Sequence, residues 1–243
     1  MVLAGPARAD WSVTASQLEK SSAGPVEHRR ITLSEEGSNE EATLDLALFS
    51  SKSVLLRVID NPSGADDLAA VMRRVRGLAG VNGGYFDPEN APVGLLISDG
   101  KSIAPFRKAR LLSGALVANK GRIELMRSAE YSPRKTATAA LQCGPFLVDG
   151  GAPVPGLNDT RPARRTFVLT GGADRAALGF CSSVTLAQLS RVLTTPRLLP
   201  EFKVQRALNL DGGSSSAFWF AGERGVYSIG EYKTVRDFVV LTR

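Results

Sequence analysis

Residues 207–216 constrain this chain more than any other stretch, because a short apolar run there ends in an acid, two glycines and three serines. Such a run predicts a buried strand that delivers the carboxylate of Asp211 to a backbone free to bend, since glycine adopts conformations that other residues avoid. Successive N–H groups in such a bend form a concave nest for phosphate or sulfate oxygens. An ordinary Asp-Gly-Gly turn is the alternative interpretation.

A second strand-to-glycine corner lies at residues 78–87 and has a similar pattern. An apolar run leads to Asn82, whose amide both donates and accepts hydrogen bonds; two glycines follow, and then Asp87. An Asn-Gly hairpin turn is the alternative. However, the residues from the glycines to Pro88 do not continue an alternating strand. We therefore expect the two corners to line one cleft.

Three arginines lie close together in a polar loop at residues 158–165, directly before an apolar run: Arg161, Arg164 and Arg165. Guanidinium groups bind phosphate or carboxylate through two parallel hydrogen bonds. Solvated charge at the entry of a strand is the alternative for any single arginine. Their clustering beside the predicted cleft favours a role in binding an anion.

Composition limits the classes of protein that the chain can belong to. With 243 residues it is long enough for one sizeable core, and we interpret residues 26–243 as a single domain. No apolar run is long enough to span a bilayer. The formal net charge of +6 comes from scattered basic residues rather than from a stripe interleaved with aromatic residues, so nucleic-acid binding ranks last.

A single histidine, His28, excludes mechanisms that need paired histidines and metal sites built from several of them. It lies in a predicted strand among charged residues, and we expect it at the surface. Cys143 and Cys181 fit either reduced core residues or one disulfide.

Residues 1–25 form a predicted N-terminal segment. The sequence from Ala7 to Ala9, before Asp10, has the small-x-small pattern of a signal-peptide cleavage site, and we interpret it as the remnant of an export signal. A periplasmic or secreted protein follows from this interpretation. A plain N-terminal tail on a cytoplasmic protein is the alternative.

Hydrophobic periodicity predicts an α+β fold, in which a mixed, largely antiparallel sheet system packs against two or three helices. Asp66 and Asp67 are expected to open one helix, which Gly77 closes. Another begins at Thr185 with a capping box formed with Gln188 and ends before Pro196. Residues 44–48 and 54–59 are expected to pair with each other. Residues 116–118 and 122–126 are expected to form a hairpin around residues 119–121, and residues 166–170 and 176–180 another. Other expected strands cover residues 26–33, 93–97, 136–142, 146–148, 217–220 and 235–241.

Taken in order, several segments resemble the phosphodiester glycosidase family. The matching segments lie at residues 82–87, 94–101, 144–148, 165–166, 185–189 and 209–216, which covers about two thirds of the chain. Two departures concern the pocket. Ser214 stands where the family often has a third glycine, and residues 167–170 replace a smaller run that contains glycine.

The resemblance implies hydrolysis of a sugar-1-phosphate diester at the anomeric carbon, which releases the sugar and leaves a phosphomonoester. Cleavage of the glycosidic C–O bond needs a carboxylate for the sugar cation and fixed donors for the departing phosphate. Asp211 is the predicted catalytic acid and Asp87 a weaker second carboxylate, which otherwise caps its local turn. The predicted substrate-binding residues are Asn82, Gly83, Gly84, Phe86, Gly144, Arg165, Thr166, Asn209, Gly212, Gly213, Ser214 and Ser215.

The expected ligand is a small or polymer-linked sugar phosphodiester, with no metal or other cofactor. Two alternatives belong to other classes. In a metal-dependent phosphodiesterase, Asp211, Asp87 and Asn82 would hold a divalent cation through oxygen atoms. In a non-catalytic module, the basic loop would bind anionic glycans of the cell envelope. The oligomeric state, the sugar and the stereochemical outcome do not follow from the sequence.

Overall fold

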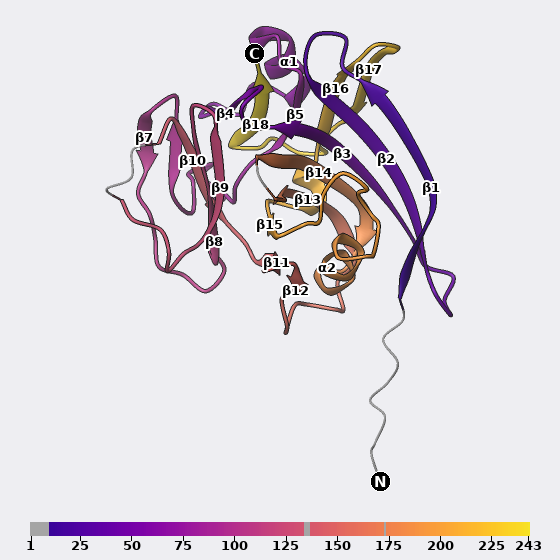
Figure 1. Cartoon of the computed structure of the whole chain (residues 1–243). Helices are drawn as coiled ribbons and strands as arrows, with labels where there is room; N and C mark the ends of the chain where they lie inside the picture. Colours follow the sequence, from indigo (N-terminus) through magenta and orange to yellow (C-terminus); the bar gives the residue numbers. More distant parts are fainter. Residues whose placement is uncertain (1–9, 134–136, 173) are drawn as a thin grey trace.

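The computed structural model describes residues 10–133, 137–172 and 174–243 of the chain. Within these ranges the strands form three sheets in which all pairs are antiparallel (Figure 1). Strands make up 48% of the chain and helices 8%. The largely antiparallel sheet system is confirmed. The fold is richer in β-structure than the predicted α+β class, because only two α-helices occur in the described ranges.

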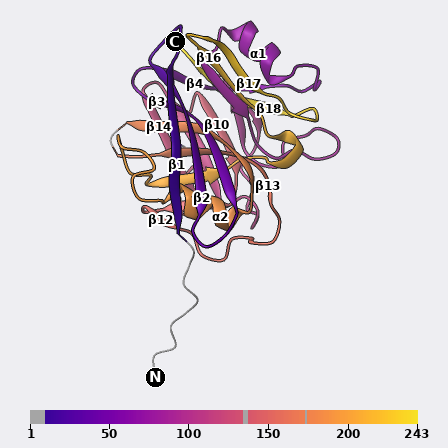
Figure 2. The ribbon, with the colours of Figure 1, turned by 90° about the vertical axis from the view of Figure 1, so that its right-hand side faces the viewer.

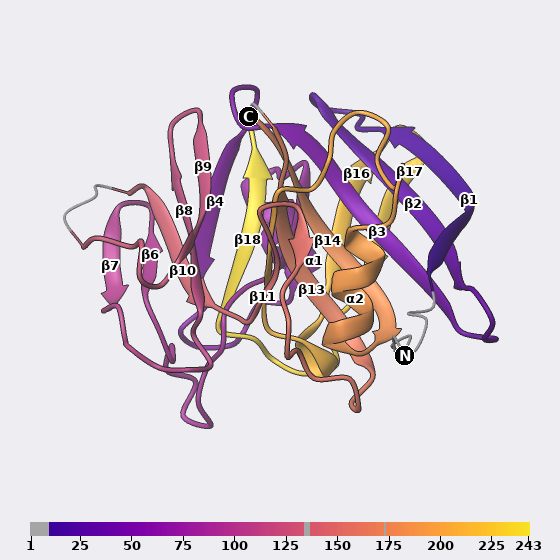
Figure 3. The ribbon, with the colours of Figure 1, turned by 60° about the horizontal axis from the view of Figure 1, so that its bottom comes forward.

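The largest sheet has eight strands in the order β1-β2-β3-β14-β13-β15-β11-β12. Its strands are β1 (Trp11–Lys20), β2 (Val26–Glu35), β3 (Glu41–Ser50), β11 (Phe146–Asp149), β12 (Ala152–Pro153), β13 (Ala163–Thr170), β14 (Arg175–Val184) and β15 (Arg206–Asn209). The predicted pairing of residues 166–170 with 176–180 is confirmed as the β13–β14 pair. Strands β1 to β3 form one outer side of the molecule (Figures 2 and 3).

A second sheet has five strands in the order β7-β6-β10-β8-β9 and lies at the opposite side from β1 (Figure 3). Its strands are β6 (Leu96–Ser98), β7 (Lys101–Ala104), β8 (Gly114–Asn119), β9 (Arg122–Arg127) and β10 (Ala139–Cys143). The predicted β8–β9 hairpin is confirmed. Its turn needs Gly121, whose φ is +74°. Thr136, where a strand was expected to begin, lies outside the described residues.

The third sheet has the order β17-β16-β5-β18-β4 and contains the chain's C-terminal strand. Its strands are β4 (Leu55–Asp60), β5 (Ala79–Asn82), β16 (Phe218–Gly222), β17 (Gly225–Ile229) and β18 (Asp237–Thr242). The expected pairing of residues 44–48 with 54–59 is wrong. Strand β3 pairs with β2 and β14, whereas β4 pairs with β18. The apolar pattern of both strands indicated that they are buried, and burial alone does not specify which strand pairs with which.

Both expected helices are present. Helix α1 (Leu68–Val75) begins where the Asp67 side chain accepts the N–H of Ala70, at 2.6 Å. Helix α2 (Leu186–Leu193) begins with a capping box between Thr185 and Gln188. It packs against β11, β12 and β14, and its apolar face joins a buried cluster with residues of β3 and β13.

The predicted surface position of His28 is wrong, because the third sheet covers that face of β2. Its side chain is buried, and its Nε2 lies 2.8 Å from Oδ1 of Asp45. The rings of Phe218, Phe220 and Tyr227 surround the imidazole, with centroids 4.7–5.3 Å away. The charged neighbours in the sequence point elsewhere, so they gave no indication of this burial.

Cys143 and Cys181 are both buried free thiols, which fits the reduced-core interpretation. The predicted N-terminal segment of residues 1–25 contains β1, which pairs with β2 along its length. The export-signal remnant at residues 7–9 lies outside the described part of the chain.

Candidate active site

The two glycine corners meet, although β5 and β15 belong to different sheets. The backbone N–H of Asp211 donates to the carbonyl of Gly83 at 3.0 Å. In return, Nδ2 of Asn82 donates to the carbonyl of Asp211 at 2.8 Å. Two segments 129 residues apart in the chain therefore form one structural unit.

Asn82 lies at the centre of this unit with its side chain fully buried. Its Oδ1 accepts the hydroxyl of Thr166 at 2.7 Å and the N–H of Ala217 at 3.0 Å. The amide thus joins the end of β5 and the middle of β13 to the segment that follows Asp211. The oxygen and one N–H of the Asn82 amide are thus hydrogen-bonded within the fold. Asn82 therefore positions the backbone of Asp211 from the buried side of the site.

Asp211 directly follows the strand β15 and Leu210, and its side chain is half-buried. Burial raises the pKa of its carboxyl, because an ionised carboxylate loses hydration there. Three groups oppose this rise in pKa: the Ser215 hydroxyl, the Lys233 ammonium and the N–H of Gly212, which donates to Oδ1 at 2.9 Å. The Ser215 hydroxyl faces the carboxyl without a hydrogen bond of normal geometry.

The backbone after Asp211 forms an open bend. Gly213 has a φ of +65° and begins a short 3₁₀ turn, η1 (Gly213–Ser215). Within the described residues, the N–H groups of Gly213 and Ser214 have no acceptor. Ser214 is exposed, whereas Ser215 is buried. The bend therefore offers two backbone donors toward solvent beside the acid, as the anion-nest interpretation requires.

Arg165 lies next to this bend, at the start of β13. Its Nε donates to the carbonyl of Val184 at 3.0 Å and its Nη2 to that of Arg161 at 2.5 Å. Its Nη1 lies 3.9 Å from the position of a Cβ added to Gly212. Burial lowers the pKa of the guanidinium, and among the described residues no carboxylate forms an ion pair with it. Its charge thus has no carboxylate partner among the described residues, and it lies beside the bend at Gly212.

The other two arginines of the predicted cluster have different surroundings. Arg164 donates from Nη2 to the carbonyls of Ser216 and, at 2.8 Å, Gly230. Its guanidinium also lies 4.2 Å from the centroid of the Tyr232 ring. Arg164 therefore ties the loop of residues 230–234 to the corner, while Arg161 is exposed in its own loop.

Asn209 and Gly144 are buried below the corner. Nδ2 of Asn209 donates to the carbonyl of Gly144 at 2.9 Å, and the hydroxyl of Tyr85 donates to the same carbonyl. A Cβ added to Gly144 would lie 2.5 Å from the carbonyl oxygen of Leu111, so only glycine fits there. This network supports β15 where it delivers the acid.

Asp87 caps a local turn. Its Oδ1 accepts the N–H of Ala91 at 2.7 Å, and its own N–H donates back to the carbonyl of Ala91. The half-buried ring of Phe86 lies 4.9 Å below the Nζ of Lys233. Phe86 is therefore linked to the acid through Lys233, whereas the carboxylate of Asp87 is engaged in the turn.

Three residues around the site were not predicted from the sequence: Tyr232, Lys233 and Asp237. Tyr232 donates its backbone N–H to the carbonyl of Ser214 at 2.7 Å, and its side chain is 78% exposed. Asp237 is buried against Gly83 and Gly84. Tyr232 and Lys233 lie in a polar stretch after β17 that has no glycine repeat or apolar periodicity, and Asp237 lies in the predicted strand at residues 235–241. No local pattern marked any of them as part of the site.

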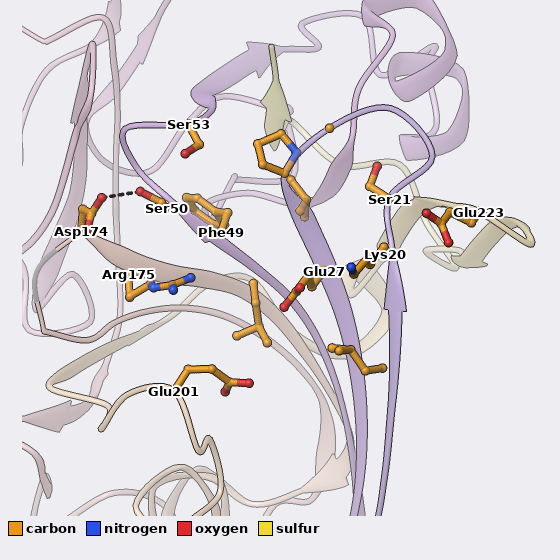
Figure 4. Close-up of a pocket in the computed structure, with 15 residues that line it drawn as sticks. Lys20, Ser21, Glu27, Phe49, Ser50, Ser53, Asp174, Arg175, Glu201 and Glu223 are labelled. Carbon is orange, nitrogen blue, oxygen red and sulfur yellow. Dashed lines mark hydrogen bonds between the residues drawn. The ribbon is translucent and has the colours of Figure 1, made fainter.

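The described residues contain no group of three or more His, Cys, Asp or Glu side chains arranged to hold a metal ion. A hollow of about 810 Å³ lies elsewhere, between β1, β2 and β3 and the segment around Arg175 (Figure 4). Its lining includes Lys20, Glu27 and Glu201 and none of the residues around Asp211. Neither α-helix in the described ranges has the length and apolar character that crossing a bilayer requires.

These features define a β-rich protein with a half-buried acid beside a bend that carries two backbone donors without acceptors among the described residues. A profile of the phosphodiester glycosidase family matches residues 76–241. The chain belongs to the phosphodiester glycosidase family. A search of curated proteins found no significant match.

Solved structures show the same fold at low sequence identity. The catalytic domain of zebrafish N-acetylglucosamine-1-phosphodiester α-N-acetylglucosaminidase, auto-inhibited by its pro-peptide, has a TM-score of 0.68 at 15% identity, covering 94% of this chain and 88% of that one. A hypothetical protein from Synechocystis has a TM-score of 0.65 at 14% identity, covering 90% and 62%. A protein from Burkholderia pseudomallei, described as a candidate exported protein, has a TM-score of 0.58 at 12% identity, covering 86% and 75%.

Proposed function

We propose that this chain hydrolyses the glycosidic C–O bond of a sugar-1-phosphate diester, releasing the sugar and leaving a phosphomonoester. The observation that carries the proposal is the half-buried carboxyl of Asp211 beside an uncompensated guanidinium and two backbone donors without acceptors. Membership of the phosphodiester glycosidase family supports the same chemistry.

In this reaction the bond between the anomeric carbon and the ester oxygen breaks, and its electron pair stays on the phosphate. Positive charge develops on the sugar ring and negative charge on the phosphate. Asp211 would face the sugar cation or accept a proton from the attacking water. Arg165 and the N–H groups of Gly213 and Ser214 would hold the phosphate, and water supplies the new oxygen on the sugar.

The buried residues of the site act by positioning in this proposal. Asn82, with Thr166 as its partner, fixes the backbone of Asp211, and Asn209 fixes the strand that precedes it. Gly83 and Gly144 admit close contacts that a side chain would block, and Gly84 supplies the N–H that Asp237 accepts. Direct contact of these residues with the substrate stays a prediction from the sequence.

We also propose that the protein works outside the cytoplasm, on envelope or secreted sugar phosphodiesters. The pattern at residues 7–9 and the resemblance to a candidate exported protein from Burkholderia pseudomallei support this location.

The decisive experiment follows the oxygen of the attacking water. The protein is incubated with the methyl diester of N-acetylglucosamine-1-phosphate in water enriched in ¹⁸O, and both products are analysed by mass spectrometry. The proposal predicts free reducing sugar with ¹⁸O at the anomeric carbon and unlabelled methyl phosphate. Label in the phosphate would identify P–O cleavage and hence a phosphodiesterase.

A panel of diesters with other sugars guards against the choice of a wrong substrate. The Asp211→Asn protein serves as the control, because it keeps the fold but loses the carboxylate. If no diester of the panel is turned over while the wild type still binds them in calorimetry, the chain is a binding module and the proposal fails.

A further inference from the structure

Asp237 is the first residue of β18, and its side chain is 1% exposed. Its Oδ1 accepts the N–H of Gly84 at 3.0 Å. A Cβ added to Gly83 would lie 1.8 Å from the same oxygen and 2.9 Å from the carboxyl carbon. The Asp237 carboxyl therefore occupies the space that a side chain at Gly83 would fill, and the N–H of Gly84 binds it there.

A short chain of hydrogen bonds connects Asp237 to Asp211. The carbonyl of Asp237 accepts the N–H of Gly83 at 2.8 Å, and the carbonyl of Gly83 accepts the N–H of Asp211 at 3.0 Å. A single residue thus separates the backbones of the two acids. Any displacement of the Asp237 carboxyl changes the turn on which Asp211 rests.

The charges around Asp237 favour its neutral form. Burial raises the pKa of its carboxyl to about 7, and the carboxylates of Asp60 and Asp211 raise it as well. Arg236 and the N–H of Gly84 oppose this rise, but Arg236 forms a two-fold ion pair with Asp60, with distances of 2.9 and 3.2 Å. The buried Cys143 thiol is near enough for the Asp237 charge to raise its pKa.

We propose that Asp237 is a positioning residue of this site: as a neutral acid it holds the Gly83–Gly84 turn in place and leaves the negative charge of the corner on Asp211. When Asp237 loses its proton, two neighbouring carboxylates repel each other and the turn loses its fixed geometry. The effect on turnover rests on the proposed function, whereas the titration of Asp237 does not.

The titration is tested by NMR on protein labelled with ¹³C at the aspartate carboxyl groups. In the wild type, the Asp237 signal should titrate near neutral pH. In Asp211→Asn, which removes the neighbouring charge, its midpoint should fall by at least about 0.5 of a pH unit. In Asp99→Asn, an exposed acid paired with Arg57, it should not move. The proposal is overturned if the Asp237 signal has its midpoint in the ordinary aspartate range, or if that midpoint is the same in Asp211→Asn as in the wild type.

The positioning role is tested by the pH profile of kcat/KM for the methyl diester. Asp237→Asn keeps an acceptor for the N–H of Gly84 and cannot ionise. Its kcat/KM at pH 6 should be about threefold lower than that of the wild type, and it should not show the wild-type decline in kcat/KM above neutral pH. Asp237→Ala also loses the acceptor, and its kcat/KM should be about 100-fold lower than that of the wild type. Equal losses in both variants with an unchanged profile would indicate a merely structural residue.

These measurements separate the two proposals. If no diester is hydrolysed, but Asp237 titrates near neutral pH and its midpoint falls in Asp211→Asn, the proposed function is wrong and the inference that Asp237 is a neutral acid is supported. If the methyl diester is hydrolysed and the Asp237 signal titrates like an exposed aspartate, the proposed function stands and this inference fails.

Discussion

The two glycine corners have nearly the same sequence pattern but opposite surroundings. At residues 82–84 every residue is buried, and the Asn82 amide is bonded within the fold. At residues 211–214 the backbone is partly open, and the N–H groups of Gly213 and Ser214 have no acceptor in the described part of the chain. One corner is the support and the other is the surface that it supports.

The difference shows what an amide and a carboxylate each do at the end of a buried strand. An amide both donates and accepts, so it is satisfied where the fold supplies both kinds of partner. A carboxylate accepts only and loses hydration when buried, so it is useful where one side stays open. Exchanging the two groups therefore tests the comparison directly.

The largest effects are expected from this reciprocal exchange. Asp211→Asn should lower kcat/KM about 100- to 10,000-fold with little change in the free energy of unfolding, because it removes the reacting carboxylate and keeps its shape. Asn82→Asp should lower the free energy of unfolding by about 3 kcal/mol, because a buried carboxylate cannot donate to the carbonyl of Asp211. Diester hydrolysis and urea denaturation measure the two quantities.

The outcome that contradicts the comparison is a reversal. If Asn82→Asp folds as stably as the wild type, the amide is not the structural support of the corner. If Asp211→Asn retains most of its activity in a folded protein, the acid lies elsewhere.

The glycines give the next test. Gly83→Ala should lower the free energy of unfolding by about 3 kcal/mol, since its Cβ would lie 1.8 Å from the Asp237 carboxyl. Gly213→Ala should cost about 1 kcal/mol, since no atom lies within 4 Å of its added Cβ and only its φ of +65° resists substitution. Thermal and urea denaturation of both variants gives the comparison, and equal costs would contradict it.

Much of this comparison could be predicted from the sequence, and the limits have physical causes. The apolar run before each glycine pair indicated a buried strand. The two corners do contact each other, whereas the expectation that both line one cleft stays a prediction. Burial of each corner depends on which sheet covers it. The long-range pairings of β5 with β16 and β18 and of β15 with β13 place the two corners, and none of them is encoded in local periodicity. His28 was misplaced for the same reason.

The residues that hold the site in place could not be predicted from local sequence patterns either. Asp237 contributes through a contact with Gly84 that spans 153 residues. Lys233 and Tyr232 reach the site because Arg164 holds their loop. By contrast, the cap of α1 and the capping box of α2 depend only on residues three apart, and both were predicted.

Two neighbouring arginines extend the comparison to substrate binding. Arg165→Met should raise KM for a diester at least about tenfold, because it removes a charged donor beside the bend. Both variants lose bonds to two carbonyl groups. Arg164→Met also loses the contact with the Tyr232 ring, so it should lower the free energy of unfolding by about 0.5 kcal/mol more than Arg165→Met does. Steady-state kinetics and denaturation of both proteins separate binding from support. Similar KM values in the two variants would contradict the assignment.

The smallest effect is expected at Lys233, which lies on the open side of Asp211. Its ammonium lowers the pKa of the Asp211 carboxyl against the rise that burial causes. Lys233→Met should therefore raise that pKa, so that the acidic limb of the kcat/KM profile moves to higher pH. The change should be modest, because the Lys233 side chain is exposed. The conservative Lys233→Arg protein keeps the charge and should keep the limb in place. High salt should shift the wild-type limb in the same direction as Lys233→Met, because it screens the same interaction. A limb that stays fixed in Lys233→Met would mean that its ionising group is not Asp211.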